Sequence, residues 1–265
     1  MQLTLRELLK RLPRYLVMVN PSKMMGVPGE WQNLSAHDTV LEALRQCSIY
    51  MGETKLEMGI QLTSMCPNHA KRGSLVSGKR ADEDWFREHT AAAARACQKL
   101  GVDTLLIIPG GVTASVPYDI CYERAVRGLK SLRPIADETG VNLAVEYVWN
   151  DFFLSPLEIR AALDEVDHPQ IGFYMDTGNM VAFAYPEQWI RILGRHVKKV
   201  HTKNFCRRPK WSWPALLKEG DVSWERVMAA LKLIGYDGPL ISEMSGTPEE
   251  HAENAVFTKA LYGAA

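Results

Sequence analysis

From residue 58 onward, short apolar runs alternate with segments that carry helical patterns and helix boundary signals. Most of these runs are nearly continuously apolar, which is typical of parallel strands that are covered on both faces. The alternation therefore predicts βα units that share one parallel sheet. We expect six strands, over residues 59–65, 104–109, 142–148, 171–176, 197–201 and 239–243.

Helices are predicted between the strands, over residues 84–100, 118–139, 155–166, 186–193 and 223–234. The third begins with the pattern of a capping box, in which Ser155 is followed by Pro156 at the first helical position and by Glu158. Pro134 lies inside the second predicted helix. It should kink or break that helix, because proline lacks the backbone N–H that a helix interior requires.

The first 57 residues follow this pattern less clearly. Residues 15–20 can form a strand, residues 38–51 a helix, and residues 55–58 a second, short strand. With these two strands the total is eight, so we expect an α/β fold of the (β/α)8 TIM-barrel type. Barrels of this kind reach about 250 residues as one domain, which predicts a single domain over residues 1–265.

Composition excludes several classes of protein. The 31 Lys and Arg residues balance the 31 Asp and Glu residues, and a net charge of zero provides no broad attraction for nucleic acid or for an acidic membrane. The five cysteines are odd in number and form no CxxC motif, which argues against a disulfide framework. Neither a signal-peptide pattern nor an apolar run of about 18 residues occurs. We expect a cytoplasmic protein with a small-molecule partner.

Four successive predicted strands each end in a carboxylate or an imidazole, namely Glu146, Asp176, His201 and Glu243. The carboxyl ends of parallel strands converge on the ligand site of such folds. Three carboxylates gathered there would repel one another and would lose hydration, and a bound cation would compensate both costs. Oxygen ligands with one imidazole suit Mn²⁺ or Mg²⁺ and tolerate Co²⁺ or Zn²⁺, and Mn²⁺ is our first choice. The plainer alternative is that each residue only caps its strand or pairs with a basic loop residue.

Five segments surround these residues, at 145–150 (VEYVWN), 175–179 (MDTGN), 200–205 (VHTKNF), 219–224 (EGDVSW) and 241–244 (ISEM). Together they resemble the sugar phosphate isomerase/epimerase family, the xylose-isomerase-like (β/α)8 barrels. The resemblance implies a metal held by Glu146, Asp176, His201 and Glu243. Members include ketose 3-epimerases, hexulose phosphate isomerases and epimerases, hydroxypyruvate isomerases and inosose dehydratases. Because relatives are often dimers or tetramers, a homo-oligomer is a further expectation.

The resemblance also suggests substrate-binding residues. Arg207 lies six residues after His201, the offset of a substrate-contacting Arg in the 3-epimerases. Asn179 stands where free-sugar 3-epimerases usually carry His, and it matches the form of sugar-phosphate members. Lys203 is the Lys of the motif that many relatives read as His-x-Lys-Asp. Asn204 replaces the final Asp of that motif, and so removes a carboxylate that could orient the Lys.

Removal of a proton from carbon beside a carbonyl needs a positioned base and stabilisation of the enediolate oxygen. Glu146 and Glu243 could serve as base and conjugate acid beside a metal-bound sugar. Proton return to the opposite face of C3 gives a 3-epimer, and return to a neighbouring carbon gives an aldose–ketose isomerisation. Loss of hydroxide from the same enediolate would be the reaction of a dehydratase. The sequence does not distinguish among these three outcomes.

Two other readings remain. A barrel that binds a sugar or a metal without turnover is favoured by the divergent start and by Asn204. An apurinic endonuclease shares the barrel, but it would need a His at the position of Asn179 and a basic DNA-binding face, and this chain has neither.

Overall fold

A computed structural model describes residues 62–67 and 73–264. Its strands form one parallel sheet in which each strand pairs with the next one along the chain, so the order is β1-β2-β3-β4-β5-β6. The strands are β1 (Ser64–Met65), β2 (Thr104–Ile107), β3 (Asn142–Glu146), β4 (Ile171–Asp176), β5 (Val197–Thr202) and β6 (Leu240–Ser242). All six strands predicted after residue 58 are therefore confirmed, some of them shortened at the ends. The strands predicted over 15–20 and 55–58, and the helix over 38–51, lie outside the described residues.

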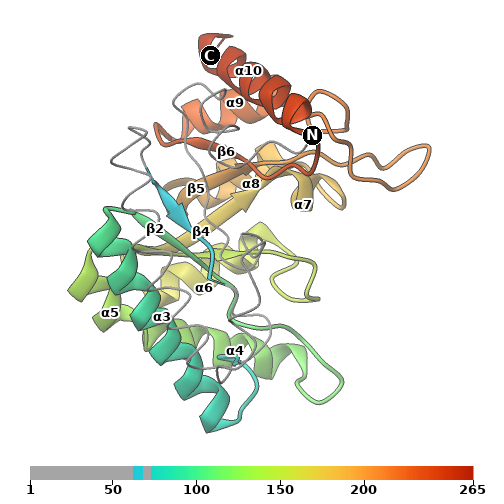
Figure 1. The fold of residues 1–265 in the computed structure, drawn as a ribbon. Coiled ribbons are helices and arrows are strands. Elements are labelled where there is room, and N and C mark those ends of the chain that lie inside the picture. The colour runs from blue at the N-terminus through green and yellow to red at the C-terminus, as the bar shows by residue number, and fades with distance from the viewer. Residues whose placement is uncertain (1–61, 68–72, 265) are drawn as a thin grey trace, which may run out of the picture.

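The helices lie outside the strands, which run side by side through the middle of the molecule (Figure 1). They are α3 (Arg80–Leu100), α4 (Tyr118–Lys130), α5 (Arg133–Thr139), α6 (Pro156–Val166), α7 (Thr177–Val181), α8 (Pro186–Leu193), α9 (Trp224–Leu233) and α10 (Pro248–Ala264), with a short 3₁₀ turn, η3 (Gly194–His196). The short α7 and the terminal α10 were not predicted. Within the described part of the chain, no helix has the length and apolar character needed to cross a membrane.

Local sequence explains where several helices begin and end. Pro134 does break the predicted helix, since α4 ends at Lys130 and α5 carries Pro134 in its first turn, where the missing N–H costs nothing. At the start of α6, the Ser155 hydroxyl accepts a hydrogen bond from the Leu157 N–H at 3.2 Å. The other half of the predicted capping box is replaced, because Glu158 instead accepts a hydrogen bond from the Tyr118 hydroxyl at 2.6 Å.

The strands bury both of their faces. Phe173 and Met175 of β4 belong to the large core between the sheet and the helices. Tyr174, between them, belongs to a smaller cluster together with residues of the other strands, Leu106, Ala144 and Ile241. Side chains alternate between the two faces of a strand. The smaller cluster therefore marks the concave side of the sheet, which is the side that bears the polar residues described next.

Candidate active site

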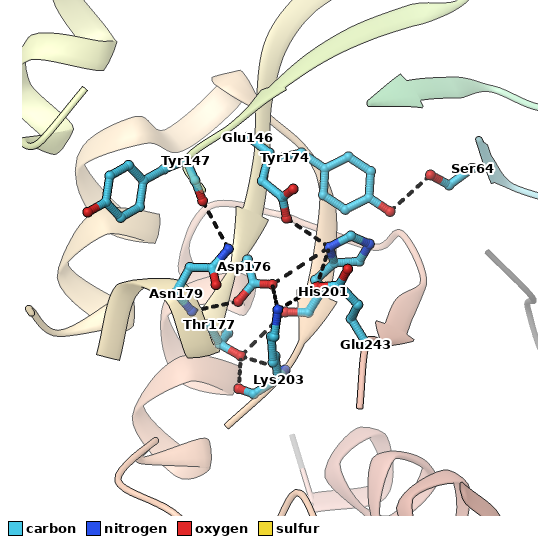
Figure 2. A network of polar contacts seen from close by, with 10 residues as sticks. All are labelled: Ser64, Glu146, Tyr147, Tyr174, Asp176, Thr177, Asn179, His201, Lys203 and Glu243. Carbon is cyan, nitrogen blue, oxygen red and sulfur yellow. Dashed lines mark hydrogen bonds and ion pairs between the residues drawn. The ribbon is translucent and has the colours of Figure 1, made fainter. Parts of the chain in front are cut away.

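The structure brings together the four polar residues predicted at the strand ends. Glu146 ends β3, Asp176 ends β4, His201 lies in β5, and Glu243 follows β6. One potential ligand atom of each lies within 4.8 Å of those of the others. Figure 2 shows the side chains pointing toward one another from their separate strands.

Strand register explains this convergence. Asp176 of β4 is the direct partner of His201 of β5, and Glu146 of β3 is the partner of Tyr174. Glu146, Asp176 and Glu243 each follow by two positions a residue of the small interior cluster. Since side chains two apart share a face of a strand, all of them must point to the concave side.

His201 lies at the centre of the four. Its Nδ1 is 3.0 Å from Glu146 Oε1, 3.7 Å from Glu243 Oε2 and 3.8 Å from Asp176 Oδ2. The ring packs against Tyr174 with 4.2 Å between centroids, and the Tyr174 hydroxyl donates to Ser64 Oγ at 2.9 Å. Burial alone would lower the pKa of His201, but the hydrogen bond to Glu146 and the surrounding carboxylates raise it.

Asp176 is fully buried and uses only one of its two oxygens in a hydrogen bond. Oδ1 accepts from the Asn179 N–H at 2.7 Å and so caps the start of α7. Oδ2 is buried without a hydrogen-bond partner and faces the cluster. Burial raises the pKa of Asp176 to about 8, with Lys203 opposing the shift and the neighbouring Glu146 and Glu243 adding to it.

Lys203 is the nearest cation that the structure places beside the carboxylates. Its Nζ donates to Glu243 Oε2 at 2.8 Å and lies 3.6 Å from Asp176 Oδ2. Burial would raise the pKa of Glu243, but the positive charges of His201 and Lys203 lower it to about 2. The pKa of Lys203 is in turn raised, because the attraction of Asp176 and Glu243 outweighs the effect of burial.

These observations fit a divalent cation. Three carboxylates and one imidazole nitrogen form the ligand set of hard or borderline metals. The buried Oδ2 of Asp176 is an acceptor that the described residues leave without a hydrogen bond, and such atoms in native proteins require an explanation. The group of four would supply that explanation by holding a metal ion.

Of the three predicted substrate residues, Asn179 and Lys203 lie beside the cluster. The side-chain N–H of Asn179 donates to the Tyr147 carbonyl at 2.9 Å, which fixes its orientation. Thr177 Oγ1 donates to the Lys203 carbonyl at 2.6 Å and joins α7 to the end of β5. Sequence reasoning missed Thr177 and Tyr174, although their positions directly after and two before Asp176 could have identified them.

Arg207 is placed differently. Its backbone N–H donates to Asp221 Oδ2 at 2.6 Å, and its side-chain Nε lies 3.5 Å from the same oxygen. The guanidinium lies 5.7 Å from the centroid of the Tyr185 ring. Arg207 is therefore part of the rim formed by the loop after β5, and its contact with a substrate stays a prediction.

Asn204 has a structural role in that loop. Its side-chain N–H donates to the Leu217 carbonyl at 2.7 Å, and its Oδ1 accepts from the N–H groups of Phe205 and Val222 at 2.9 and 3.0 Å. Lys203 is held by Glu243 instead. Glu243 therefore orients Lys203 in this chain, where Asn204 has no carboxylate to do so.

Comparisons with known proteins support the fold. A family model described as "Xylose isomerase-like TIM barrel" matches residues 6–261, which confirms the predicted barrel. The chain is 27% identical over 207 residues to L-ribulose-5-phosphate 3-epimerase UlaE of Salmonella paratyphi C (strain RKS4594), and the match covers 75% of this chain and 68% of that protein.

Two solved structures illustrate the similarity in three dimensions. A D-psicose 3-epimerase determined in the presence of D-fructose has a TM-score of 0.72 at 17% identity, covering 96% of this chain and 91% of that one. The IOLI protein with a binding zinc atom has a TM-score of 0.65 at 17% identity, covering 86% and 85%. At these identities the likeness concerns the fold.

Proposed function

The chain belongs to the xylose isomerase-like TIM barrel family, and from this membership we propose that it is a metal-dependent sugar isomerase or epimerase. The observation that carries the proposal is the convergence of Glu146, Asp176, His201 and Glu243 from four strands. The similarity to a protein named L-ribulose-5-phosphate 3-epimerase supports a ketose or ketose phosphate as the substrate.

The reaction we propose is proton transfer at the carbon beside the ketose carbonyl, through a cis-enediolate. We assign proton removal to Glu243 because its carboxylate lies at the end of a strand, in the cluster that would hold the sugar, and because His201 and Lys203 lower its pKa and so keep it ionised and able to accept a proton. Glu146, the second glutamate of the cluster, would deliver a proton to the opposite face of the same carbon. Removal from one face and delivery to the other inverts C3, so a 3-epimer is the product we expect.

Glu146, Asp176, His201 and Glu243 would hold the divalent cation, with Mn²⁺ as our first choice among metals that also include Mg²⁺, Co²⁺ and Zn²⁺. When bound, such a cation polarises the substrate carbonyl and stabilises negative charge on its oxygen. The fold neighbour that carries zinc supports a divalent ion in barrels of this type.

The other residues of the site would bind and orient the sugar. Lys203 holds a positive charge next to Glu243 and can donate to a substrate hydroxyl or carbonyl oxygen. Asn179 has its donor side committed to Tyr147, so its amide oxygen is the group available to accept from a substrate hydroxyl. Arg207, on the rim, would reach the end of the substrate farther from the reacting carbon.

The proposal is tested by exchange with deuterated solvent. Purified protein with added Mn²⁺ is incubated in deuterated water with ketoses, ketose phosphates and hydroxypyruvate, and NMR locates the label. We expect label at C3 of a ketose or ketose phosphate together with its 3-epimer. Label at a different carbon would instead indicate an aldose–ketose isomerase, a hydroxypyruvate isomerase or an inosose-type dehydratase. Absence of label from every compound would favour a sugar- or metal-binding barrel without turnover.

Variants connect the exchange to the site. Glu243→Gln and Glu146→Gln keep the shape of the side chain but remove the base, so each should stop exchange while the protein stays folded by circular dichroism. Glu165→Gln, on the exposed face of α6, is the matched control and should exchange at the wild-type rate. Wild-type exchange by Glu243→Gln would exclude Glu243 as the base.

A homo-oligomeric state, a cytoplasmic location and the absence of nucleic-acid and membrane partners stay predictions.

A further inference from the structure

Five aromatic side chains form a cluster at the rim of the site. We call Trp149, Phe183, Phe205, Trp211 and Trp213 the aromatic wall. Trp149 is its centre, since its ring centroid lies 5.3 Å from that of Phe183, 5.5 Å from Phe205, 6.3 Å from Trp211 and 5.2 Å from Trp213. The wall joins residues that follow β3, α7 and β5 along the chain.

The wall is held in place by backbone contacts. The indole N–H of Trp149 donates to the Asn179 carbonyl at 3.0 Å. In the loop from β5 to α9 (orange in Figure 1), Cys206 and Ser212 exchange two backbone hydrogen bonds of 2.9 and 3.1 Å. Trp211 and Trp213 flank Ser212, so their side chains emerge on the same side of this bridge. The wall is therefore pre-formed, which lowers the cost of binding a ligand.

Much of the wall nevertheless remains in contact with water. Phe183 is 58% exposed, Trp211 is 53% exposed and Trp213 is 46% exposed. Single exposed apolar residues are common, but a group of large aromatic side chains gathered in one place marks a binding surface. The wall is therefore suited to bind a ligand.

The wall adjoins the four-residue cluster directly. Nζ of Lys203 lies 4.6 Å from the ring centroid of Trp213 and 2.8 Å from Glu243 Oε2. Lys203 therefore contacts both Glu243 and the wall, so a molecule that is held at Glu243 would lie close to Trp213. This continuity favours a part of the substrate, rather than a separate partner, as the occupant.

The chemistry of the wall favours an uncharged ring. Its five residues carry no charge, and two of the cations beside it are already paired, Lys203 with Glu243 and Arg207 with Asp221. The C–H face of a sugar ring is apolar and matches an aromatic surface, while its hydroxyl edge can remain in water. A phosphate group would gain little from the aromatic rings themselves and would depend instead on Arg208 and Lys210, the exposed cations that precede Trp211 in the same loop.

We propose that the aromatic wall is a second subsite that stacks against an uncharged sugar ring, so that the substrate is a ketose linked to another sugar. The inference rests on the proposed function for the position of the ketose. The second ring would lie on Trp211 and Phe183, the two most exposed members of the wall.

The test compares three substrates that share one ketose: fructose, fructose 6-phosphate and isomaltulose, in which glucose is joined to O6 of fructose. NMR of deuterium uptake gives kcat/KM for each. We expect isomaltulose to have the highest value. Trp211→Ala should lower the ratio of kcat/KM for isomaltulose to that for fructose by about tenfold, the loss of one aromatic stacking contact. Trp211→Phe should restore most of the ratio, because it keeps an aromatic face.

Leu233→Ala is the matched control, since Leu233 is a large apolar residue that is 71% exposed at the end of α9. It should leave the ratio unchanged. Preference for fructose 6-phosphate over isomaltulose would overturn the inference, and so would an unchanged ratio in Trp211→Ala. Size-exclusion chromatography supplies a further check, because a dimer that dissociates in Trp211→Ala would assign the wall to a second copy of the chain.

A failure of the proposed function can be told apart from a failure of the subsite. If none of the three sugars takes up deuterium, isomaltulose is titrated while tryptophan fluorescence is recorded. Saturable quenching that is weakened in Trp211→Ala and kept in Leu233→Ala would support the subsite although the reaction is absent. No quenching would overturn the subsite as well.

Discussion

Nδ1 of His201 lies 3.0 Å from Oε1 of Glu146, although the two residues are 55 positions apart in the chain. Both side chains are almost completely buried, and two further carboxylates approach the same nitrogen. Such an arrangement is unfavourable for a neutral imidazole that could pair with only one carboxylate. Its stability therefore depends on positive charge at the centre of the cluster, and this dependence leads to the first two predictions.

His201→Gln should weaken metal binding by roughly 100-fold or more, since loss of a residue that merely orients a ligand already costs about 10- to 100-fold. Isothermal titration calorimetry with Mn²⁺ measures the change. His196→Gln is the matched control, because His196 precedes the same strand but contacts Asp164 at 2.8 Å, away from the cluster. Equal affinities for the two variants would show that His201 is not a ligand.

Metal affinity should rise with pH. A pKa of about 8 means that Asp176 holds a proton at neutral pH in the metal-free protein, and the metal must displace this proton. The raised pKa of His201 acts in the same direction. Affinity should increase by up to about tenfold per pH unit for each proton released, and level off above about pH 8. Calorimetry in buffers of different ionisation enthalpy counts the protons, and a pH-independent affinity without proton release would contradict the assignment.

Asn204→Asp should destabilise the protein even though it restores the residue that many relatives carry. Asn204 is 1% exposed, and an aspartate would place a carboxylate oxygen against the Leu217 carbonyl that now receives a hydrogen bond. The free energy of unfolding should fall by about 1–3 kcal/mol, as measured by urea denaturation. Asn142→Asp, at the half-buried start of β3, should cost less. A stabilised Asn204→Asp protein would mean that the loop can rearrange around a carboxylate.

A second lysine, Lys199, is buried on the same side of the sheet as His201, and the strength of its ion pair can be tested. Lys199 is 2% exposed, and its Nζ pairs with Asp103 Oδ1 at 2.6 Å. Asp103→Asn would leave the buried ammonium without its counter-charge, at a cost of about 1–3 kcal/mol because the Asp103 side chain is itself 58% exposed, whereas Lys199→Met removes the charge and keeps the volume. Denaturation curves should therefore rank Lys199→Met as the more stable variant, and the reverse order would show that water reaches the Lys199 ammonium.

Much of the site was predictable because it depends on short-range patterns. The strand ends at Glu146, Asp176 and His201 follow apolar runs that bury both faces, and polar residues at those ends must lie at the same edge of a parallel sheet. The break at Pro134 was likewise predictable from a missing N–H. The predicted capping box was only half confirmed. Ser155 caps the helix, but Glu158 accepts a hydrogen bond from Tyr118, which is 40 positions away in the chain.

The amino-acid sequence by itself determined the barrel architecture and the identity of the four converging residues, because strand periodicity and helix boundaries are local properties of the chain. Only the tertiary structure decided that Lys203 bonds to Glu243, that Asn204 supports the following loop, and that Trp149 unites residues of three loops into the aromatic wall. These contacts join positions far apart in the chain. They depend on strand register and loop packing, which no local pattern encodes.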